Sequence, residues 1–321
     1  MAEVIKNELV ELTPEELKKF KRVPLSEEES EHLASEPYSY WKSVMRVFLK
    51  KSSARIGLAV GAIVLFCTIF LPLVAPDSAF LKNAGTMNQG PSSSYWFGTD
   101  AQGRDLFFCC WKGLGKSMQL ALICSAINIS IGTILGLCWG FFRRIDRIMI
   151  EIYNLISNIP SLLLYMLLSV IVSSVFPTWK PETKLIIALC LFGWLGVSLF
   201  VRNFTLIITN REYNVASKTL GSSPWRIMFK NLLPFLLGVI ITEISLMIPG
   251  MISSEVSLSY FGFGLPSNAI SIGAILELGR TEFTNYPWQL LWPGGMLAVV
   301  IFIFYLLGLS LSDSLDPKKH R

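Results

Sequence analysis

Long apolar runs alternate with short polar segments along this chain of 321 residues. Six runs are uninterrupted or nearly so, and they lie at about 56–75, 118–142, 155–176, 185–208, 235–263 and 288–311. A helix needs about 20 residues to cross about 30 Å of hydrocarbon at about 1.5 Å per residue, and every run is near or above that length. The roughly ten-residue alternating strands of a membrane β-barrel are absent. The pattern therefore predicts an all-α integral membrane protein with six transmembrane helices.

The polar segments between the runs differ strongly in their basic residues. If the N-terminus is cytoplasmic, the segments 1–55, 143–147, 202–230 and 312–321 lie inside, and they hold 21 of the 28 Lys and Arg residues. Loops rich in Lys and Arg stay on the cytoplasmic side of a membrane. We therefore expect a multi-pass plasma-membrane protein with both termini in the cytoplasm. Its charged first 40 residues do not have the order of a secretory signal peptide.

The N-terminal segment, residues 1–53, is predicted to be cytoplasmic and to end in a helix at the membrane interface. Two Ser/Thr-x-x-Glu sequences, which begin at Thr13 and Ser26, fit capping boxes and predict two short helices. Over about 40–51, apolar side chains recur at helical spacing and Lys and Arg occupy the other face, which is typical of an interfacial helix. The alternative for this helix is packing on a partner protein. Its apolar positions are Trp41, Val44, Met45, Phe48 and Leu49.

A polar insert at residues 211–234 separates the fourth and fifth apolar runs. Glu212, Ala216 and Leu220 are four residues apart, so they line one face of a helix, and the small Ala lets another surface approach closely. Gly221 follows, and glycine readily adopts the left-handed conformation that ends a helix. The first half of the insert is therefore predicted to be a short helix with a sharp stop.

The second half of the insert has the signals of a new helix. Ser223 is a typical N-cap, and Pro224 fits the first helical position, where no N–H is needed. Pro234 marks the junction with the next span. A connection between two spans needs only a few residues. We therefore expect this helix-turn-helix to dock on a cytoplasmic partner.

Several motifs resemble those of a known family. The series Glu-Tyr-x-x-Ala-x-x-x-Leu-Gly at 212–221, followed by Leu233-Pro234, is similar to the signature loop of permease subunits of ATP-binding-cassette importers. The likeness is to the second permease of oligopeptide and dipeptide importers in particular. It runs from about residue 95 to the C-terminus. Further matching pieces follow in order: FGTDAQGRD at 97–105, GW at 193–194 with Arg202, SEVSLSYFGFGLP at 254–266, WPGG at 292–295 and SDSLDP at 312–317.

The resemblance implies a fold, a function and partners. It implies the type I importer permease fold, with a cytoplasmic coupling-helix loop, in a permease subunit of an ATP-driven importer of short peptides in the bacterial cell membrane. The partners implied are a homologous permease, two cytoplasmic ATPase subunits that bind ATP and Mg²⁺, and an extracellular substrate-binding lipoprotein. In this family the coupling helix sits in a groove of an ATPase subunit. The residues expected to dock here are Glu212, Tyr213, Ala216, Leu220, Gly221, Ser222, Ser223 and Pro224.

The same resemblance divides the chain into regions after residue 53. Residues 54–116 hold the first transmembrane helix and an extracellular loop, 117–313 the core permease domain with five helices and the coupling loop 209–234, and 314–321 a cytoplasmic tail. Departures from the family concern five positions. Asn231 and Phe235 stand where the family has His and Asn. Ile150, Glu151 and Asn154 stand where it has Met, Arg and Asp.

The sequence does not present a catalytic or cofactor site. CWKGLGKS at 110–117 ends like a phosphate-binding loop, but its first glycine is replaced by Cys110 and no buried strand precedes it. We expect no cofactor bound by this chain and no enzymatic activity of its own. The six cysteines lie mostly in apolar runs and the chain has two histidines, which argues against a metal site. The net charge of +5 has no basic-aromatic module beside it, so we expect no nucleic-acid partner.

Two acidic residues, Glu243 and Glu255, interrupt the fifth apolar run. A carboxylate at the bilayer centre costs about 2.5 to 3.5 kcal/mol, so each should face a wet cavity or a polar partner. We predict that Glu243, Glu255 and Ser259 line the translocation path; for Glu255, a hydrogen bond between subunits is the alternative. A different function would be an ion-coupled secondary transporter that uses both carboxylates, which should show inverted repeats and would leave the insert unexplained.

Two segments on the predicted outer side are rich in turn residues and aromatics. They read SYWFGTDAQGRD and GFGLPSNAISIG. Two interpretations fit: they receive a substrate-binding protein, or they pack on each other and cap an outer vestibule.

Overall fold

The computed structural model describes residues 40–266 and 268–315. Contacts divide the chain into two units, Met1–Ser43 and Val44–Arg321, and the fold below is that of the second unit. The two helices predicted near Thr13 and Ser26 lie outside the described residues, as does most of the predicted tail.

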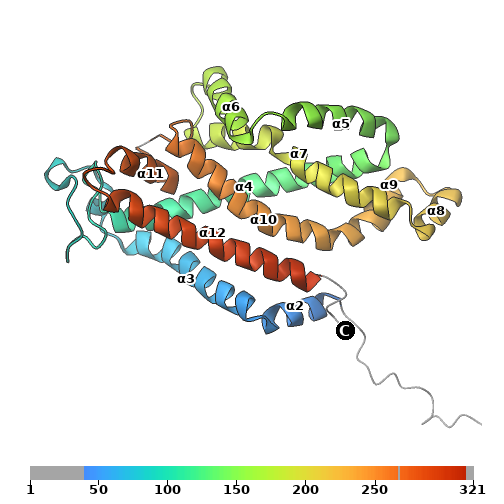
Figure 1. Cartoon of the computed structure of the whole chain (residues 1–321), viewed down its shortest axis with the longest axis horizontal. Helices are drawn as coiled ribbons and strands as arrows, with labels where there is room; N and C mark the ends of the chain where they lie inside the picture. The colour runs from blue at the N-terminus through green and yellow to red at the C-terminus, as the bar shows by residue number, and fades with distance from the viewer. Residues whose placement is uncertain (1–39, 267, 316–321) are drawn as a thin grey trace, which may run out of the picture. The chain divides into compact units, whose positions relative to one another are not determined.

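Within the described residues, five helical stretches are long and apolar enough to cross a membrane (Figure 1). They are α3 (Ser52–Val74), α4 (Leu106–Phe141), α7 (Pro181–Thr209), Pro224–Tyr260 and α12 (Trp288–Leu315). A sixth crossing is present if α5 (Arg143–Ser157) and α6 (Ser161–Val175) are counted together, although the two helices meet at an angle of 91°. The all-α membrane architecture predicted from the apolar runs is confirmed, with the third span as the exception to regular geometry.

The third predicted span, 155–176, is wrong as a single helix. Pro160 has no N–H and disfavours helical backbone at Ile159, so the chain breaks between α5 and α6. The 15 residues of α6 extend only about 22 Å at about 1.5 Å per residue, less than the hydrocarbon thickness of about 30 Å. No residue of α5 is buried. The apolar run concealed this bend because hydrophobicity does not report where a proline ends a helix.

The second span begins earlier than predicted. Asp105 caps α4, and its Oδ1 accepts a hydrogen bond from the N–H of Phe107 at 2.9 Å. Burial raises the pKa of the Asp105 carboxyl even though this hydrogen bond opposes the shift. The predicted domain boundary at 116/117 therefore falls inside a helix. Residues 110–117 are also helical, so their likeness to a phosphate-binding loop does not correspond to a loop.

Helix α4 is the central element, and it packs most closely against α7. Three glycines of α4 face α7 at four-residue intervals: Gly132, Gly136 and Gly140. A Cβ atom at any of them would lie 2.6 to 2.7 Å from an atom of α7. Small residues at this spacing let two membrane helices come into backbone contact.

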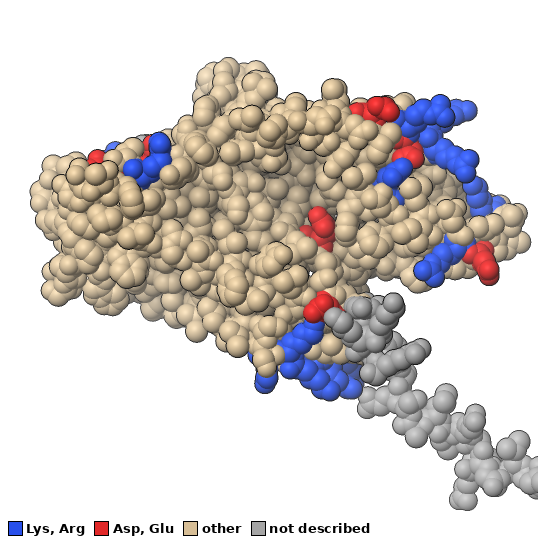
Figure 2. Space-filling model, in the orientation of Figure 1, with Lys and Arg blue, Asp and Glu red and all other residues tan. Residues whose placement is uncertain are grey.

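The two ends of this helical bundle differ. One end holds the start of α5, α8 (Glu212–Thr219) and α9 (Pro224–Arg226); we call it the coupling end. The other holds the α3–α4 connection at 75–105, with the short turns η2 (Asp77–Phe80) and η3 (Ala84–Thr86), and α11 (Ile272–Thr281); we call it the cap end (Figure 1). On the face shown in Figure 2, most Lys and Arg lie at and near the coupling end.

Helix α2 (Tyr40–Lys50) confirms the helix predicted at about 40–51. Its apolar face is only partly covered by protein: Val44 and Phe48 are buried, whereas Met45 and Leu49 are about half exposed, at 54% and 46%. Partial exposure of an apolar helix face next to a membrane span suits a helix that lies in the membrane interface.

Candidate functional site

The insert begins with a short helix and a sharp turn, as predicted. Helix α8 starts at Glu212 and is followed by Gly221 with φ at +81°, the left-handed conformation that ends helices. Ser223 then caps α9: its hydroxyl accepts a hydrogen bond from the N–H of Arg226 at 3.3 Å. Pro224 occupies the first turn of α9.

The second half of the insert is not a separate helix, which corrects the prediction. Helix α9, a π-helical turn η4 (Ile227–Leu232) and α10 (Leu233–Tyr260) form one helical stretch of 37 residues. Pro234 has no N–H and its ring would clash with a carbonyl one turn earlier in a regular helix, and the wider π turn before it leaves room. The coupling loop therefore continues directly into the fifth span.

A buried asparagine joins α8 to the rest of the chain. Asn214 is the buried residue of α8, at 2% exposure. Its Nδ2 donates to the carbonyl of Ile208 in α7 at 2.8 Å, and its Oδ1 accepts from Nδ2 of Asn231 in η4 at 3.2 Å. Asn231, whose contacts were in doubt from the sequence, thus takes part in a polar bridge.

Asn214 is not among the residues predicted from the sequence, because it lies between the positions that match the family's loop and is not itself one of them. The signal that was available is its low helix propensity: an Asn inside a helix of eight residues is favourable only where its side chain has partners.

The residues expected to dock on an ATPase are accessible. Seven of the eight are exposed and Ser222 is half-buried. Leu220 is 86% exposed, an unusual position for a large apolar side chain. A Cβ at Gly221 would meet nothing within 4 Å, so the turn has free space around it. Docking on an ATPase stays a prediction. The residues expected to take part in it are accessible in this structure.

Aromatic side chains continue this accessible surface beyond α8. The rings of Trp225 and Phe229 stack with their centroids 5.9 Å apart, and the ring centroids of Tyr213 and Phe235 are 5.7 Å apart. All four are exposed, by 41% to 63%. Aromatic residues are enriched at the centres of protein interfaces. They also suit the headgroup layer of a membrane.

Glu255 and Ser259, which are predicted to line the translocation path, face no open path in this structure. Both are enclosed within this single chain, at 0% and 1% exposure. The hydroxyl of Ser259 donates to Oε1 of Glu255 at 3.1 Å, and the hydroxyls of Ser117 and Ser271 also face this carboxyl. The same burial leaves Glu255 no open face for a hydrogen bond to another subunit. The cluster joins α10 to α4 and to the start of α11.

Glu243 has different surroundings. It lies in α10 and is half-buried, and no hydrogen bond or ion pair of its side chain is present among the described residues. A half-buried carboxylate in an apolar span requires water or a polar group from outside the subunit. Of the three residues predicted to line the path, Glu243 is the one that the geometry leaves available.

An ion pair ties α5 to α7 near the coupling end. Arg202 Nε and Nη2 donate to the two carboxylate oxygens of Asp146 at 2.7 and 2.9 Å. This two-point geometry is the strong form of an Arg–carboxylate pair. It anchors a helix that has no buried residue of its own.

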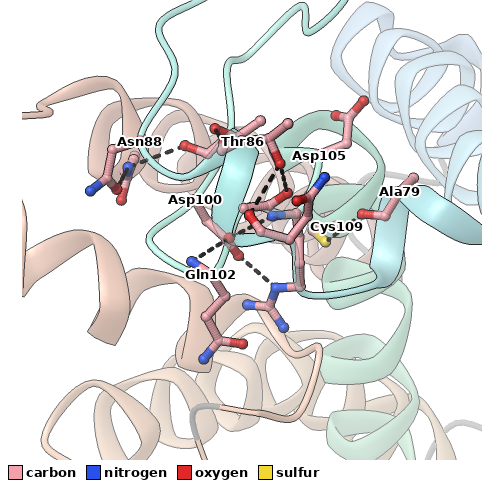
Figure 3. Close-up of polar contacts among 12 residues, drawn as sticks. Ala79, Thr86, Asn88, Asp100, Gln102, Asp105 and Cys109 are labelled. Carbon is pink, nitrogen blue, oxygen red and sulfur yellow. Dashed lines mark hydrogen bonds and ion pairs between the residues drawn. The ribbon is translucent and has the colours of Figure 1, made fainter.

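The segment SYWFGTDAQGRD forms a folded cap rather than an open loop (Figure 3). Asp100 and Arg104 make a buried ion pair at 2.6 Å, and each side chain is 2% exposed. The side chain of Gln289 in α12 donates to the carbonyl of Thr99 at 3.1 Å and to Oδ1 of Asn88 at 2.8 Å. The cap is therefore fastened to α12. The two interpretations of the outer segments, that they receive a substrate-binding protein or that they pack on each other, stay predictions.

Two family models match the chain. Residues 128–321 match the binding-protein-dependent transport system inner membrane component, and residues 39–91 match the N-terminal TM domain of oligopeptide transport permease C. The first match includes the coupling loop, α10 and α12.

Similar curated proteins are bacterial peptide permeases. The oligopeptide transport system permease protein AmiD of Streptococcus pneumoniae is 34% identical over 94% of this chain and 98% of its own length. The oligopeptide transport system permease protein OppC of Bacillus subtilis is 33% identical over 90% of this chain and 93% of its own length. The dipeptide transport system permease protein DppC of Bacillus subtilis is 34% identical over 88% of this chain and 87% of its own length.

A solved structure shares the fold. A chain of the MetNI methionine ABC transporter, in inward-facing conformations, matches with a TM-score of 0.52 and 15% identity, over 65% of this chain and 97% of that chain. The match at this identity concerns the fold alone. Because one family model covers more than half of the residues and the relatives span most of the rest, this chain belongs to the family of binding-protein-dependent transport system inner membrane components.

Proposed function

We propose that this chain is the permease subunit of an ATP-driven importer of short peptides. The observation that carries the proposal is the exposed helix α8, which one tight turn at Gly221 connects to the continuous helical stretch Pro224–Tyr260 that crosses the membrane. The names of the relatives, which are oligopeptide and dipeptide permeases, support peptides as the substrate class.

The complete importer needs further subunits. We assign to it a homologous permease that forms the path together with this chain, two cytoplasmic ATPases that bind ATP and Mg²⁺, and an extracellular substrate-binding lipoprotein. This chain contributes part of the path, with Glu243 facing it, and the docking surface around α8. The coupling end is cytoplasmic, because Lys and Arg gather at and near it on the face shown in Figure 2. Both termini are assigned to the same side from the Lys and Arg bias of the sequence.

The mechanism follows from the connection between α8 and α10. ATP favours closed ATPases, and closure moves the docked α8. Since Asn214 binds α8 to both α7 and η4, the movement reaches two spans at once. The nucleotide thereby biases the permeases between inward-open and outward-open states, which is a coupling between two sites through a shared equilibrium.

The alternative of an ion-coupled transporter has little support. A carrier that used both Glu243 and Glu255 would need ions to reach each carboxylate, and Glu255 is enclosed by its own chain. Membership of a binding-protein-dependent family also argues against this mechanism.

The proposal can be tested at Ala216, an exposed small residue on the docking face. In Ala216→Arg, a long charged side chain should keep the ATPase from approaching. We expect the ATPase to be lost on copurification and peptide uptake into proteoliposomes to fall at least tenfold. Ala216→Ser is the matched control and should retain both. The proposal is wrong if the Ala216→Arg complex assembles and transports peptide like the wild type.

A further inference from the structure

A pocket of about 560 Å³ lies at the coupling end. The end of α4, the start of α5, the end of α7 and the α8–α9 turn surround it. Its apolar wall comes from Phe141, Phe142 and Leu206. The positive charges on its lining are Arg143, Arg144 and Lys218.

These three cations have no acidic partner in the part of the chain that the structure describes. No Asp or Glu lines the pocket, and the ion pairs of the described residues involve other side chains. Thr209 also lines the pocket, and its hydroxyl makes no hydrogen bond among the same residues. Helix α5 begins at Arg143 without a capping side chain, so its first N–H groups are unpaired donors. The pocket thus gathers donors and positive charge.

A second pocket at the cap end provides a useful comparison. It has a volume of about 620 Å³ and is lined by Lys112 and Lys116. There, Lys116 pairs with Glu182 at 3.1 Å, and Lys112 lies 3.8 Å above the ring of Phe80. Its cations are therefore partnered within the chain, whereas those of the coupling-end pocket are not.

We propose that the coupling-end pocket binds the headgroup of an anionic phospholipid from the cytoplasmic leaflet. Each of its two walls is built from the end of a membrane span, since α4 ends at Phe141 and α7 ends at Thr209. Span ends lie at the depth of lipid headgroups, and basic pockets between spans on the cytoplasmic side suit anionic lipids. The apolar wall accepts the start of the acyl chains. The carboxyl ends of α4 and α7 contribute about half a negative charge each, which three formal positive charges exceed.

A bound headgroup would connect the coupling loop to α4. Lys218 belongs to α8, whereas Arg143 and Arg144 follow the end of α4. A phosphate between them bridges two elements that otherwise carry like charges. The position of α8 then depends on the lipid composition of the membrane. The choice of leaflet rests on the proposed orientation of the chain, but occupancy of the pocket can be measured without transport.

Lipid retention tests the proposal. The transporter containing the full chain would be extracted from membranes in mild detergent, and retained phosphatidylglycerol and cardiolipin would be counted by native mass spectrometry. The variant Arg143→Gln with Arg144→Gln removes two pocket charges. Arg226→Gln with Lys230→Gln removes two exposed charges from the same end, outside the pocket lining. Arg143→Lys with Arg144→Lys keeps the charge and reports on folding.

We expect the wild type, the Arg226/Lys230 variant and the Lys variant to retain anionic phospholipid, and the Arg143/Arg144 Gln variant to retain at least fivefold less. An excess of inorganic phosphate should not displace the lipid. Equal retention by the two Gln variants, or a wild type without anionic lipid, overturns the proposal. The proposal is also overturned if the Arg143/Arg144 Gln variant loses the ATPase but retains as much lipid as the wild type. The pocket would then receive an acidic side chain of a protein.

Discussion

At the scale of single residues, Asn214 is the most consequential finding. The residues on either side of it match the family's loop and are exposed, which is where a partner would dock. Asn214 points the other way, into the contact between α7 and η4. The residues predicted to dock and the buried residue that joins α8 to α7 and η4 thus lie within about two helical turns of one another.

Removal of this amide should uncouple α8. Asn214→Ala removes the side-chain hydrogen bonds from Asn214 to the carbonyl of Ile208 and to Asn231, although the carbonyl keeps a backbone donor and Asn231 keeps a hydroxyl of α8. Each lost hydrogen bond contributes about 0.5 to 1.5 kcal/mol net. We expect peptide uptake in proteoliposomes to fall about tenfold while ATPase copurification persists. Asn154→Ala, at an exposed position of α5, is the control and should transport normally. Normal uptake by Asn214→Ala would show that α8 is held by other contacts.

The exposed face of α8 could be predicted from the sequence, whereas the surroundings of Glu255 could not. The exposed face of α8 follows from four-residue spacing and a glycine stop, which are local properties. Whether Glu255 faces a path or the interior depends on which serines of α4 and α11 come near it. Those serines are far away in sequence, so the apolar pattern of α10 does not contain this information.

At the scale of elements, the apolar runs located the spans but not their breaks or closest contacts. Length and hydrophobicity suffice to predict α3, α4, α7 and α12. The bend between α5 and α6 and the π turn before Pro234 depend on single prolines within apolar surroundings. The α4–α7 contact depends on three glycines that an average of hydrophobicity does not distinguish.

The α4–α7 contact makes a prediction about stability. Gly136→Leu places a side chain against the backbone of Ser198, where a Cβ alone would lie 2.6 Å from the carbonyl oxygen. Overpacking typically costs about 1 to 3 kcal/mol, and a rigid backbone cannot give way easily. We expect a clearly lower temperature of thermal unfolding for the purified chain in detergent.

Gly295→Leu in α12 is the matched control, because a Cβ at Gly295 meets nothing within 4 Å. Its unfolding temperature should stay close to that of the wild type. If the two variants unfold at the same temperature, the close approach of α4 and α7 contributes little to stability.

At the scale of the whole molecule, the helical stretch Pro224–Tyr260 links the coupling end to the cap end. It begins at the turn after α8 and ends beside the cluster around Glu255, which holds the start of α11. A displacement at one end can therefore be carried along a helix that continues past Pro234 and Pro249, although each proline lacks the N–H for one hydrogen bond of the helix. The sequence predicts a junction at Pro234, and the structure has a widened but unbroken turn there.

Insertion of a flexible joint tests this connection. Two glycines inserted between Arg226 and Ile227 should leave α8 able to dock but break the helical link from the α8–α9 turn to α10, so that the side-chain contact of Asn214 with Asn231 has to carry the movement alone. We expect ATP hydrolysis to continue while uptake per ATP falls at least tenfold in proteoliposomes. The same insertion between Pro177 and Thr178, in the connection from α6 to α7, should leave the ratio unchanged. Coupled transport by the first variant would contradict a rigid link.

The ion pair of Asp100 and Arg104 has a consequence for whatever approaches the molecule from the cap side. Charges sealed from solvent are screened little by salt, so the segment keeps its shape across a wide range of ionic strength. A visiting protein or solute meets a surface that is already ordered. The segment therefore loses little conformational entropy when another molecule binds to it. The rate of binding is then set by how often the two molecules meet, and not by folding of the segment.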